Sequence, residues 1–310
     1  MTQVVVIKKT KSSKKYYALY FMMIPGVIYF IINSYLPMLG IIIAFKNINF
    51  TKGLLNSEWI GFKNFEYLFK TTDAFIITRN TILYNSVFII INLVAAVAVA
   101  ILLNEVKNRL MARFYQSVIL LPYLISMVIV GYLVFSVLSS ETGWINKTIL
   151  PLFGMDWISW YSEPKYWPVI LGLVNLWKNS GYLCVIYYAA IIGIDHEYYE
   201  AAEIDGASKW QQIVNITLPL IKQVMVVMTL LQVGRIFYSD FGLFYQVPLN
   251  AGALLSATNV IDTYVYRALM TTADIGMASA AGLYQSVVGF IMVVVSNYVV
   301  RKVDKENALF

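Results

Sequence analysis

The residues of this chain that could do chemistry are few, and they suit binding better than catalysis. Two apolar stretches, 168–194 and 217–240, carry amides, aromatic rings, two cations and one carboxylate. These polar residues are Asn175, Trp177, Lys178, Asn179, Tyr182, Gln232, Arg235, Tyr238 and Asp240. Amides and hydroxyls donate and accept hydrogen bonds, and polar side chains inside apolar stretches usually face a cavity or another helix. The set therefore predicts a polar binding path.

Some of these residues also have a purely structural interpretation. Tryptophan and tyrosine are enriched at membrane–water interfaces without binding anything. Lys178 and Arg235 could extend toward lipid headgroups or pair with Asp240. Either arrangement would remove the two cations from a binding path.

Covalent and metal chemistry have little support in the sequence. Cys184 is the only cysteine and His196 the only histidine, so neither has a partner for a disulfide or a metal site. No Gly-x-x-x-x-Gly-Lys-Ser/Thr phosphate loop occurs. We expect no catalytic residue, no metal and no cofactor on this chain, which is therefore not predicted to be an enzyme.

Residues 195–219 form a short polar segment that predicts two helices joined by a turn. Gly206 suits the left-handed conformation that ends a helix, and Ser208 with Gln211 matches a capping box that begins the next one. Pro219 is expected to interrupt the backbone at the entry to the following apolar stretch. Two capped helices in so short a loop suggest that a soluble partner binds it. The alternative is a solvated loop with ordinary helix caps.

The first of these two helices would present a face of small side chains. Asp195 can cap its beginning, and Tyr198, Ala201 and Ala202 follow at three- and four-residue steps. Small side chains on one face would allow another surface to approach the helix closely.

The elements that must position these residues are apolar blocks long enough to cross a bilayer. Hydrophobic residues make up 59% of the chain and charged residues 13%, whereas a soluble domain carries about 25% charged residues. About 20 apolar residues span the hydrocarbon core, where the backbone must satisfy its own hydrogen bonds. The expected spans are 17–45, 81–103, 114–138, 168–194, 217–240 and 280–300. The sequence therefore predicts an all-α polytopic membrane protein with six transmembrane helices.

The distribution of basic residues predicts the orientation of the chain. The tails 1–16 and 301–310, and the connection 104–113, are rich in lysine or arginine. Because such residues favour the cytoplasmic side, both termini and the loop 195–216 of the span domain 17–300 are expected there. Attraction to anionic lipid explains the net charge of +6, and no nucleic-acid partner is expected.

The polar loop also carries a spaced signature. It consists of Glu200-Ala201-Ala202, Gly206 after three further residues, and Ile216-x-Leu218-Pro219 after nine more. This signature resembles the EAA loop of ABC importer permeases, whose coupling helices dock in a cleft of the ATPase subunit. The resemblance implies that the coupling residues are Tyr199, Glu200, Ala201, Ala202, Asp205, Gly206 and Ala207.

Further segments resemble carbohydrate-uptake permeases of the maltose-importer type, in their short six-span form. They are Pro25-Gly26, Trp59-x-Gly61-x-x-Asn64-Phe65, and Asn175-x-Trp177 before Gly181. Residues 240–248 and 262–267 are similar to the branch associated with oligosaccharides and polysaccharide fragments. The resemblance implies the type I importer permease fold.

The resemblance also implies a transport subunit of the bacterial plasma membrane with no reaction of its own. Its implied partners are a second homologous permease, a cytoplasmic ATPase dimer that holds ATP and Mg, an extracellular solute-binding protein and membrane lipid. Sugar hydroxyls and C–H faces would suit the amides and rings of the polar path.

Two alternatives remain open. One is an ABC permease for a non-sugar solute. The other is an ion-coupled secondary transporter or membrane enzyme, which would need buried acidic residues. Apart from Asp240, the spans contain almost none.

Overall fold

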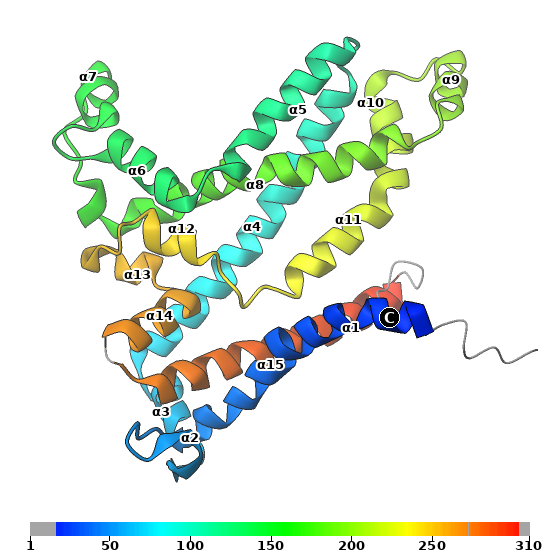
Figure 1. The fold of residues 1–310 in the computed structure, drawn as a ribbon. Helices are drawn as coiled ribbons and strands as arrows, with labels where there is room; N and C mark the ends of the chain where they lie inside the picture. The colour runs from blue at the N-terminus through cyan, green and yellow to red at the C-terminus, as the bar shows by residue number, and fades with distance from the viewer. Residues whose placement is uncertain (1–16, 272, 304–310) are drawn as a thin grey trace, which may run out of the picture.

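The computed structural model describes residues 17–271 and 273–303, which fold almost entirely into helices (Figure 1). The long elements are α1 (Tyr17–Phe30) with η2 (Ile31–Tyr35) and η3 (Leu36–Phe45), α4 (Thr72–Asn104), α5 (Arg109–Leu124), α6 (Met127–Leu138), α8 (Trp167–Ile192), α10 (Lys209–Gln212) with η7 (Ile213–Thr217) and α11 (Leu218–Val233), and α15 (Ile275–Val303).

The connections between these helices are short elements. They are β1 (Lys46–Asn47), α2 (Gly53–Asn56), β2 (Glu58–Trp59), α3 (Lys63–Lys70), η4 (Ile145–Ile149), α7 (Leu150–Leu152), η5 (Trp160–Ser162), η6 (Pro164–Tyr166), α9 (Glu197–Ile204), α12 (Phe241–Gln246), η8 (Gly252–Leu254), α13 (Leu255–Thr258) and α14 (Ile261–Thr271). Strands β1 and β2 pair antiparallel, with Lys46 opposite Trp59.

The predicted all-α architecture with six spans is confirmed, with changes in where the spans begin and end. Five helical runs are long and apolar enough to cross a membrane, and a bent helix pair is the sixth. The second span begins at Thr72 rather than residue 81, where the Thr71 hydroxyl accepts a hydrogen bond from the Ala74 N–H. The predicted N-terminal tail, 1–16, lies outside the described residues. The predicted C-terminal tail begins inside α15, and only its residues 304–310 lie outside.

The third span is broken rather than straight. Helices α5 and α6 meet at an angle of 94°. Pro122 lies in the last turn of α5, Ile125 and Ser126 adopt extended backbone, and the Ser126 hydroxyl then caps α6 by accepting from the Ile129 N–H. The expectation of one continuous helix over 114–138 is therefore wrong, because the backbone becomes extended at Ile125 and Ser126 and the serine hydroxyl caps a new helix.

The fifth span is continuous where the sequence predicted an interruption. It runs from Lys209 to Val233, and Pro219 lies inside it. The turn before the proline, η7, is π-helical, and the Leu218 N–H bonds to the Ile213 carbonyl five residues earlier. A wider π turn accommodates a residue that lacks an N–H. The same arrangement, a π turn ending two residues before a proline, occurs at η2 and η4.

The bundle is built around the contact between α4 and α8. Helix α5 packs along α8, and α15 packs against η3 and α14 (Figure 1). Ala96 and Ala100 of α4 are fully buried against Leu183, Cys184 and Tyr187 of α8. The alanine-rich run in α4 thus allows close helix approach, as its small side chains predict.

Gly181 marks a still closer contact between α8 and α5. A Cβ atom at this position would lie 2.0 Å from the Ile119 carbonyl oxygen, and backbone atoms cannot turn aside as a flexible side chain can. The two helices therefore depend on a residue without a side chain at this point.

We expect Gly181→Ala to destabilise the protein by roughly 1–3 kcal/mol, because the methyl group must push α5 away from α8. Gly172→Ala on the same helix is the matched control, since a Cβ there meets nothing within 4 Å. Melting temperatures of the two variants in detergent test this. Equal melting temperatures would contradict it.

Candidate functional site

A polar cavity, here called the central cavity, lies among α4, α5, α8 and α11 and the segment that follows α11. It has a volume of about 480 Å³. Its lining includes five amide side chains, four asparagines and one glutamine, that project from three different helices, together with three tyrosines, one arginine and one aspartate. The polar and aromatic residues of the lining are Asn85, Phe88, Asn92, Tyr123, Asn175, Asn179, Tyr182, Gln232, Arg235, Tyr238 and Asp240.

The structure brings together most of the polar residues that the sequence assigned to a binding path. The cavity is lined by Asn175, Asn179, Tyr182, Gln232, Arg235, Tyr238 and Asp240. Arg235, Tyr238 and Asp240 lie beyond the end of α11, in the segment that leads to α12, rather than in a helical span. Trp177 and Lys178 lie elsewhere.

Trp177 belongs to a different surface of α8. It lines an apolar groove with Leu133, Trp160 and Val169, and it is 47% exposed. Asn175, two residues earlier in the sequence, is buried beside the central cavity. The helical rotation between the two positions therefore separates residues that looked like one group in the sequence.

Lys178 is buried and holds the broken third span. Its Nζ donates to the carbonyl oxygens of Pro122 at 3.2 Å, Tyr123 at 3.2 Å and Ile125 at 2.5 Å. Among the described residues Lys178 is not paired with Asp240. Asp240 instead caps α12, where its Oδ1 accepts from the Leu243 N–H at 3.1 Å. The cation thus supplies donors to the carbonyls at the end of α5 and at the break that follows it.

Sequence reasoning missed three cavity residues, Asn85, Asn92 and Tyr123. The Asn92 amide donates to Asn175 Oδ1 at 2.8 Å, and the Asn85 amide donates to the Ile236 carbonyl at 2.7 Å. The Tyr123 ring stacks on the Tyr182 ring at 4.8 Å and 14°. The available signal was the spacing of the two asparagines, which lie about two helical turns apart on one face of an apolar helix.

Two buried amide atoms at the cavity lack a hydrogen-bond partner among the described residues. They are Gln232 Nε2, a donor, and Asn92 Oδ1, an acceptor. A buried polar group without a partner is unfavourable. Both atoms are shielded by the chain itself, so the residues around the cavity keep hydrogen-bonding capacity that the described contacts do not use.

The second candidate site, here called the coupling segment, comprises residues 195–219. The capping box at Ser208 and Gln211 is confirmed. Gly206 has a φ of +78°, and the Ala207 N–H bonds to the Ala202 carbonyl at 2.9 Å, which ends α9 in a left-handed turn as predicted. Asp195 Oδ1 accepts from the Glu197 N–H at 3.1 Å.

The coupling segment presents a mostly exposed surface. Of the residues implied in ATPase coupling, Glu200, Ala201, Asp205 and Gly206 are exposed, and Tyr199, Ala202 and Ala207 are half-buried. Apolar side chains lie among them, with Ile204 87% and Trp210 72% exposed. Exposed large apolar side chains beside small ones on a polar segment are typical of a surface that binds another protein.

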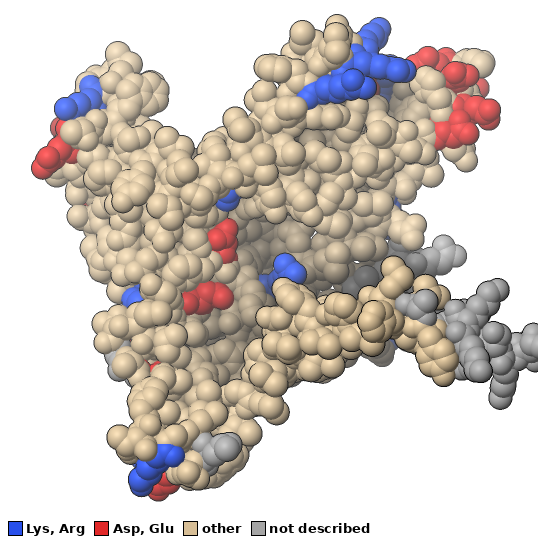
Figure 2. Space-filling view, in the orientation of Figure 1, with Lys and Arg blue, Asp and Glu red and all other residues tan. Residues whose placement is uncertain are grey.

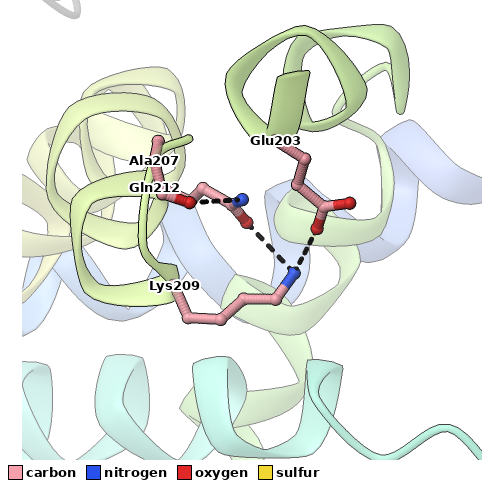
Figure 3. A network of polar contacts seen from close by, with 4 residues as sticks. All are labelled: Glu203, Ala207, Lys209 and Gln212. Atoms are coloured by element: carbon pink, nitrogen blue, oxygen red, sulfur yellow. Dashed lines mark hydrogen bonds and ion pairs between the residues drawn. The ribbon is translucent and has the colours of Figure 1, made fainter. Parts of the chain in front are cut away.

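Charged side chains cluster at the end of the bundle that carries the coupling segment. Figure 2 shows acidic side chains over α9 and basic ones over the α4–α5 tip, on an otherwise largely uncharged face. Lys209 Nζ lies 2.7 Å from Glu203 Oε1 and 3.2 Å from Gln212 Oε1 (Figure 3). The hydrogen bond and charge of Lys209 lower the pKa of the Glu203 carboxyl.

A bundle of apolar helices around a polar cavity, with a structured polar segment exposed at one end, defines a membrane permease. The particular family follows from comparison with known proteins. Residues 92–305 match the model of the "binding-protein-dependent transport system inner membrane component" family, so the chain belongs to that family.

Individual relatives agree over nearly the whole length. Protein LplB of Bacillus subtilis (strain 168) is 36% identical over 290 residues, covering 93% of this chain and 90% of that protein. The polygalacturonan/rhamnogalacturonan transport system permease protein YteP of the same organism is 36% identical over 294 residues, covering 93% and 89%. A chain in the crystal structure of a bacterial ABC transporter that imports the acidic polysaccharide alginate superposes with a TM-score of 0.85 and 31% identity, covering 94% of this chain and 97% of that chain.

The chain is accordingly the permease subunit of an ABC importer, with the type I fold, and it is a bacterial membrane protein. The family is a non-catalytic transport component, which agrees with the prediction that the chain is not an enzyme. Family membership also excludes the ion-coupled secondary transporter that the sequence left open.

We expect Lys178→Met to lower the stability of the protein in detergent. Methionine fills similar space but removes the charged donor shared by the three carbonyls, and a buried acceptor left unsatisfied costs about 1–3 kcal/mol. Lys52→Met, at an exposed position, is the control. Thermal unfolding of both variants tests the role of the buried cation, and an unchanged melting temperature for Lys178→Met would refute it.

Proposed function

We propose that this chain and a second homologous permease form the translocation path for an oligosaccharide or polysaccharide fragment. An extracellular binding protein delivers the sugar, and a cytoplasmic ATPase dimer that holds ATP and Mg drives import. The observation that carries the substrate class is the central cavity, which is lined by five amide-bearing residues and a stacked pair of tyrosines.

The chemistry of the cavity suits a sugar. The amide side chains that line the cavity carry both donors and acceptors, which match a sugar hydroxyl that can accept and donate at once. The rings of Tyr123 and Tyr182 offer apolar faces for the C–H side of a pyranose.

The charges of the lining argue against a small anion. Arg235 and Asp240 both line the cavity, so one positive side chain is accompanied by one negative side chain. A permease for phosphate or another oxyanion would favour an excess of positive charge. The names of relatives support a saccharide as well, since they include polygalacturonan/rhamnogalacturonan and maltodextrin permeases and an alginate importer.

The coupling segment is the proposed ATPase-docking surface. Closure of the ATPase dimer on ATP binding would move α9, and the spans would swing between inward- and outward-facing arrangements. The end of α4 and the coupling segment line one shared cleft, which includes Glu105, Lys107 and His196, so both belong to the same end of the bundle. Lysine and arginine at that end support a cytoplasmic location for it and for both termini.

Reconstitution of the complete transporter in liposomes tests the proposed function. The chain would be purified with its co-eluting permease and ATPase, and uptake would be measured with binding protein and a panel of labelled uronic and neutral oligosaccharides. ATP-dependent uptake of at least one saccharide is expected. Uptake of amino acids or phosphate, with no saccharide imported, would overturn the substrate class and leave the importer class intact.

We expect Asn179→Leu to lower saccharide uptake by up to about tenfold, because a hydrogen bond worth roughly 1 kcal/mol is lost from the path. Trp177→Leu is the control on the same helix, since Trp177 lies outside the cavity, and uptake should stay within about twofold of the wild-type rate. A larger loss in Trp177→Leu than in Asn179→Leu would contradict the proposed path.

We expect Gly206→Leu to abolish uptake while membrane insertion and folding persist. A Cβ there meets nothing within 4 Å, so the side chain would project from the surface that docks the ATPase. Gly154→Leu is a matched control, because Gly154 also has positive φ, +61°, and open surroundings at a different loop. The two variants share a backbone strain of about 1–2 kcal/mol, so equal uptake by both would count against docking at Gly206.

A further inference from the structure

Helix α9 is tied to the fifth span by side-chain contacts at two levels. At the outer level, Lys209 bridges Glu203 of α9 and Gln212 of α10, and Gln212 Nε2 donates to the Ala207 carbonyl at 3.4 Å (Figure 3). At the inner level, the Tyr199 hydroxyl lies 2.9 Å from the Thr217 hydroxyl.

The two levels differ in their exposure to solvent. The side chains of Lys209 and Glu203 are 62% and 56% exposed, and an ion pair at such a position contributes little because water and salt screen it. Thr217 is only 4% exposed, and Tyr199 is half-buried. A hydrogen bond between less exposed groups is stronger and more directional, so the inner contact is the firmer of the two.

Few other contacts hold α9 against the bundle. No residue of α9, which is described along its whole length, is buried. A cleft of about 660 Å³ separates the base of the helix from the end of α4. A movement imposed on α9 from outside would therefore reach the bundle through the inner contact and the short backbone connections from α9 to α8 and to α10.

Thr217 occupies a special position in the fifth span. It is the last residue of the π turn η7, two residues before Pro219. A π turn is a local irregularity in a helix and occurs frequently at functional sites. From this turn α11 continues without a break to Gln232, which lines the central cavity.

We propose that the Tyr199–Thr217 hydrogen bond transmits movement of α9 to the fifth span. We also propose that the fifth span bends at η7 when α9 moves. Tyr199 and Thr217 are positioning residues in this scheme. These two residues determine the position of the cavity-lining end of α11 relative to α9. The proposal rests on the proposed function, since it assumes that an ATPase moves α9.

The test measures how many solute molecules are imported per ATP hydrolysed by the complete reconstituted transporter. Thr217→Val and Tyr199→Phe each remove one hydroxyl and keep the shape of the side chain. Each should lower this ratio about fivefold or more while ATP hydrolysis continues. Thr217→Ser keeps the hydroxyl and should restore the ratio to within about twofold of the wild-type value. The double variant should be no worse than either single one, because both remove the same contact.

Lys70→Gln, which removes a similarly exposed ion pair with Glu66 in α3 and outside the coupling segment, is the matched control and should leave the ratio within about twofold of the wild-type value. Ratios near the wild-type value for Thr217→Val and Tyr199→Phe, additive losses in the double variant, or no rescue by Thr217→Ser would each overturn the proposal. If Thr217→Val does not assemble, Tyr199→Phe still decides the matter, because its hydroxyl is lost from a less buried residue. The ratio is measured with whichever solute the wild-type complex imports, so a failure to import saccharides affects only the proposed function.

Discussion

The arrangement of this permease depends on one buried cation. A span that breaks inside a membrane leaves carbonyl groups without donors, and the hydrocarbon offers no water to replace them. The ammonium group of Lys178 donates to three carbonyl oxygens at this break, two at the end of α5 and one just beyond it. The same contact holds α5 on α8 beside Gly181, where the backbones touch. The break in turn brings Tyr123 to the wall of the central cavity. A polar path through an apolar bundle is possible because this break is stabilised.

The amides of the cavity have a double role. Asn92 and Asn175 join α4 to α8, and Asn85 holds the carbonyls of Ile236 and Tyr238 after α11 has ended. Each amide has more hydrogen-bonding capacity than these contacts use. The residues that fix the helices relative to one another therefore also line the cavity.

The sequence predicts the local features of the structure well and the non-local ones poorly. The end of α9 and the beginning of α10 depend on residues within a few positions of each other. Gly206 therefore predicts the first, and the pair Ser208–Gln211 predicts the second, from sequence alone. The spans were readable from length and apolarity alone. The partners of Lys178 lie more than 50 residues away in sequence, on another helix, and no periodicity encodes that contact. The π turn before Pro219 was missed because proline predicts a break and not the wider turn that avoids one.

The packing of the first span has a consequence for the order in which the protein can be made. Almost none of the span Leu19–Phe45 is buried within the chain, and η3 packs on α15, the last helix (Figure 1). A nascent chain is synthesised from its N-terminus, so the first helix enters the bilayer long before its partner exists. Helix α3 contacts η3 early, but until α15 emerges the face of η3 that meets α15 is left to lipid or another protein. Biogenesis of this subunit therefore includes a long-range closure between an early and a late segment, and a chain truncated before α15 would lack it.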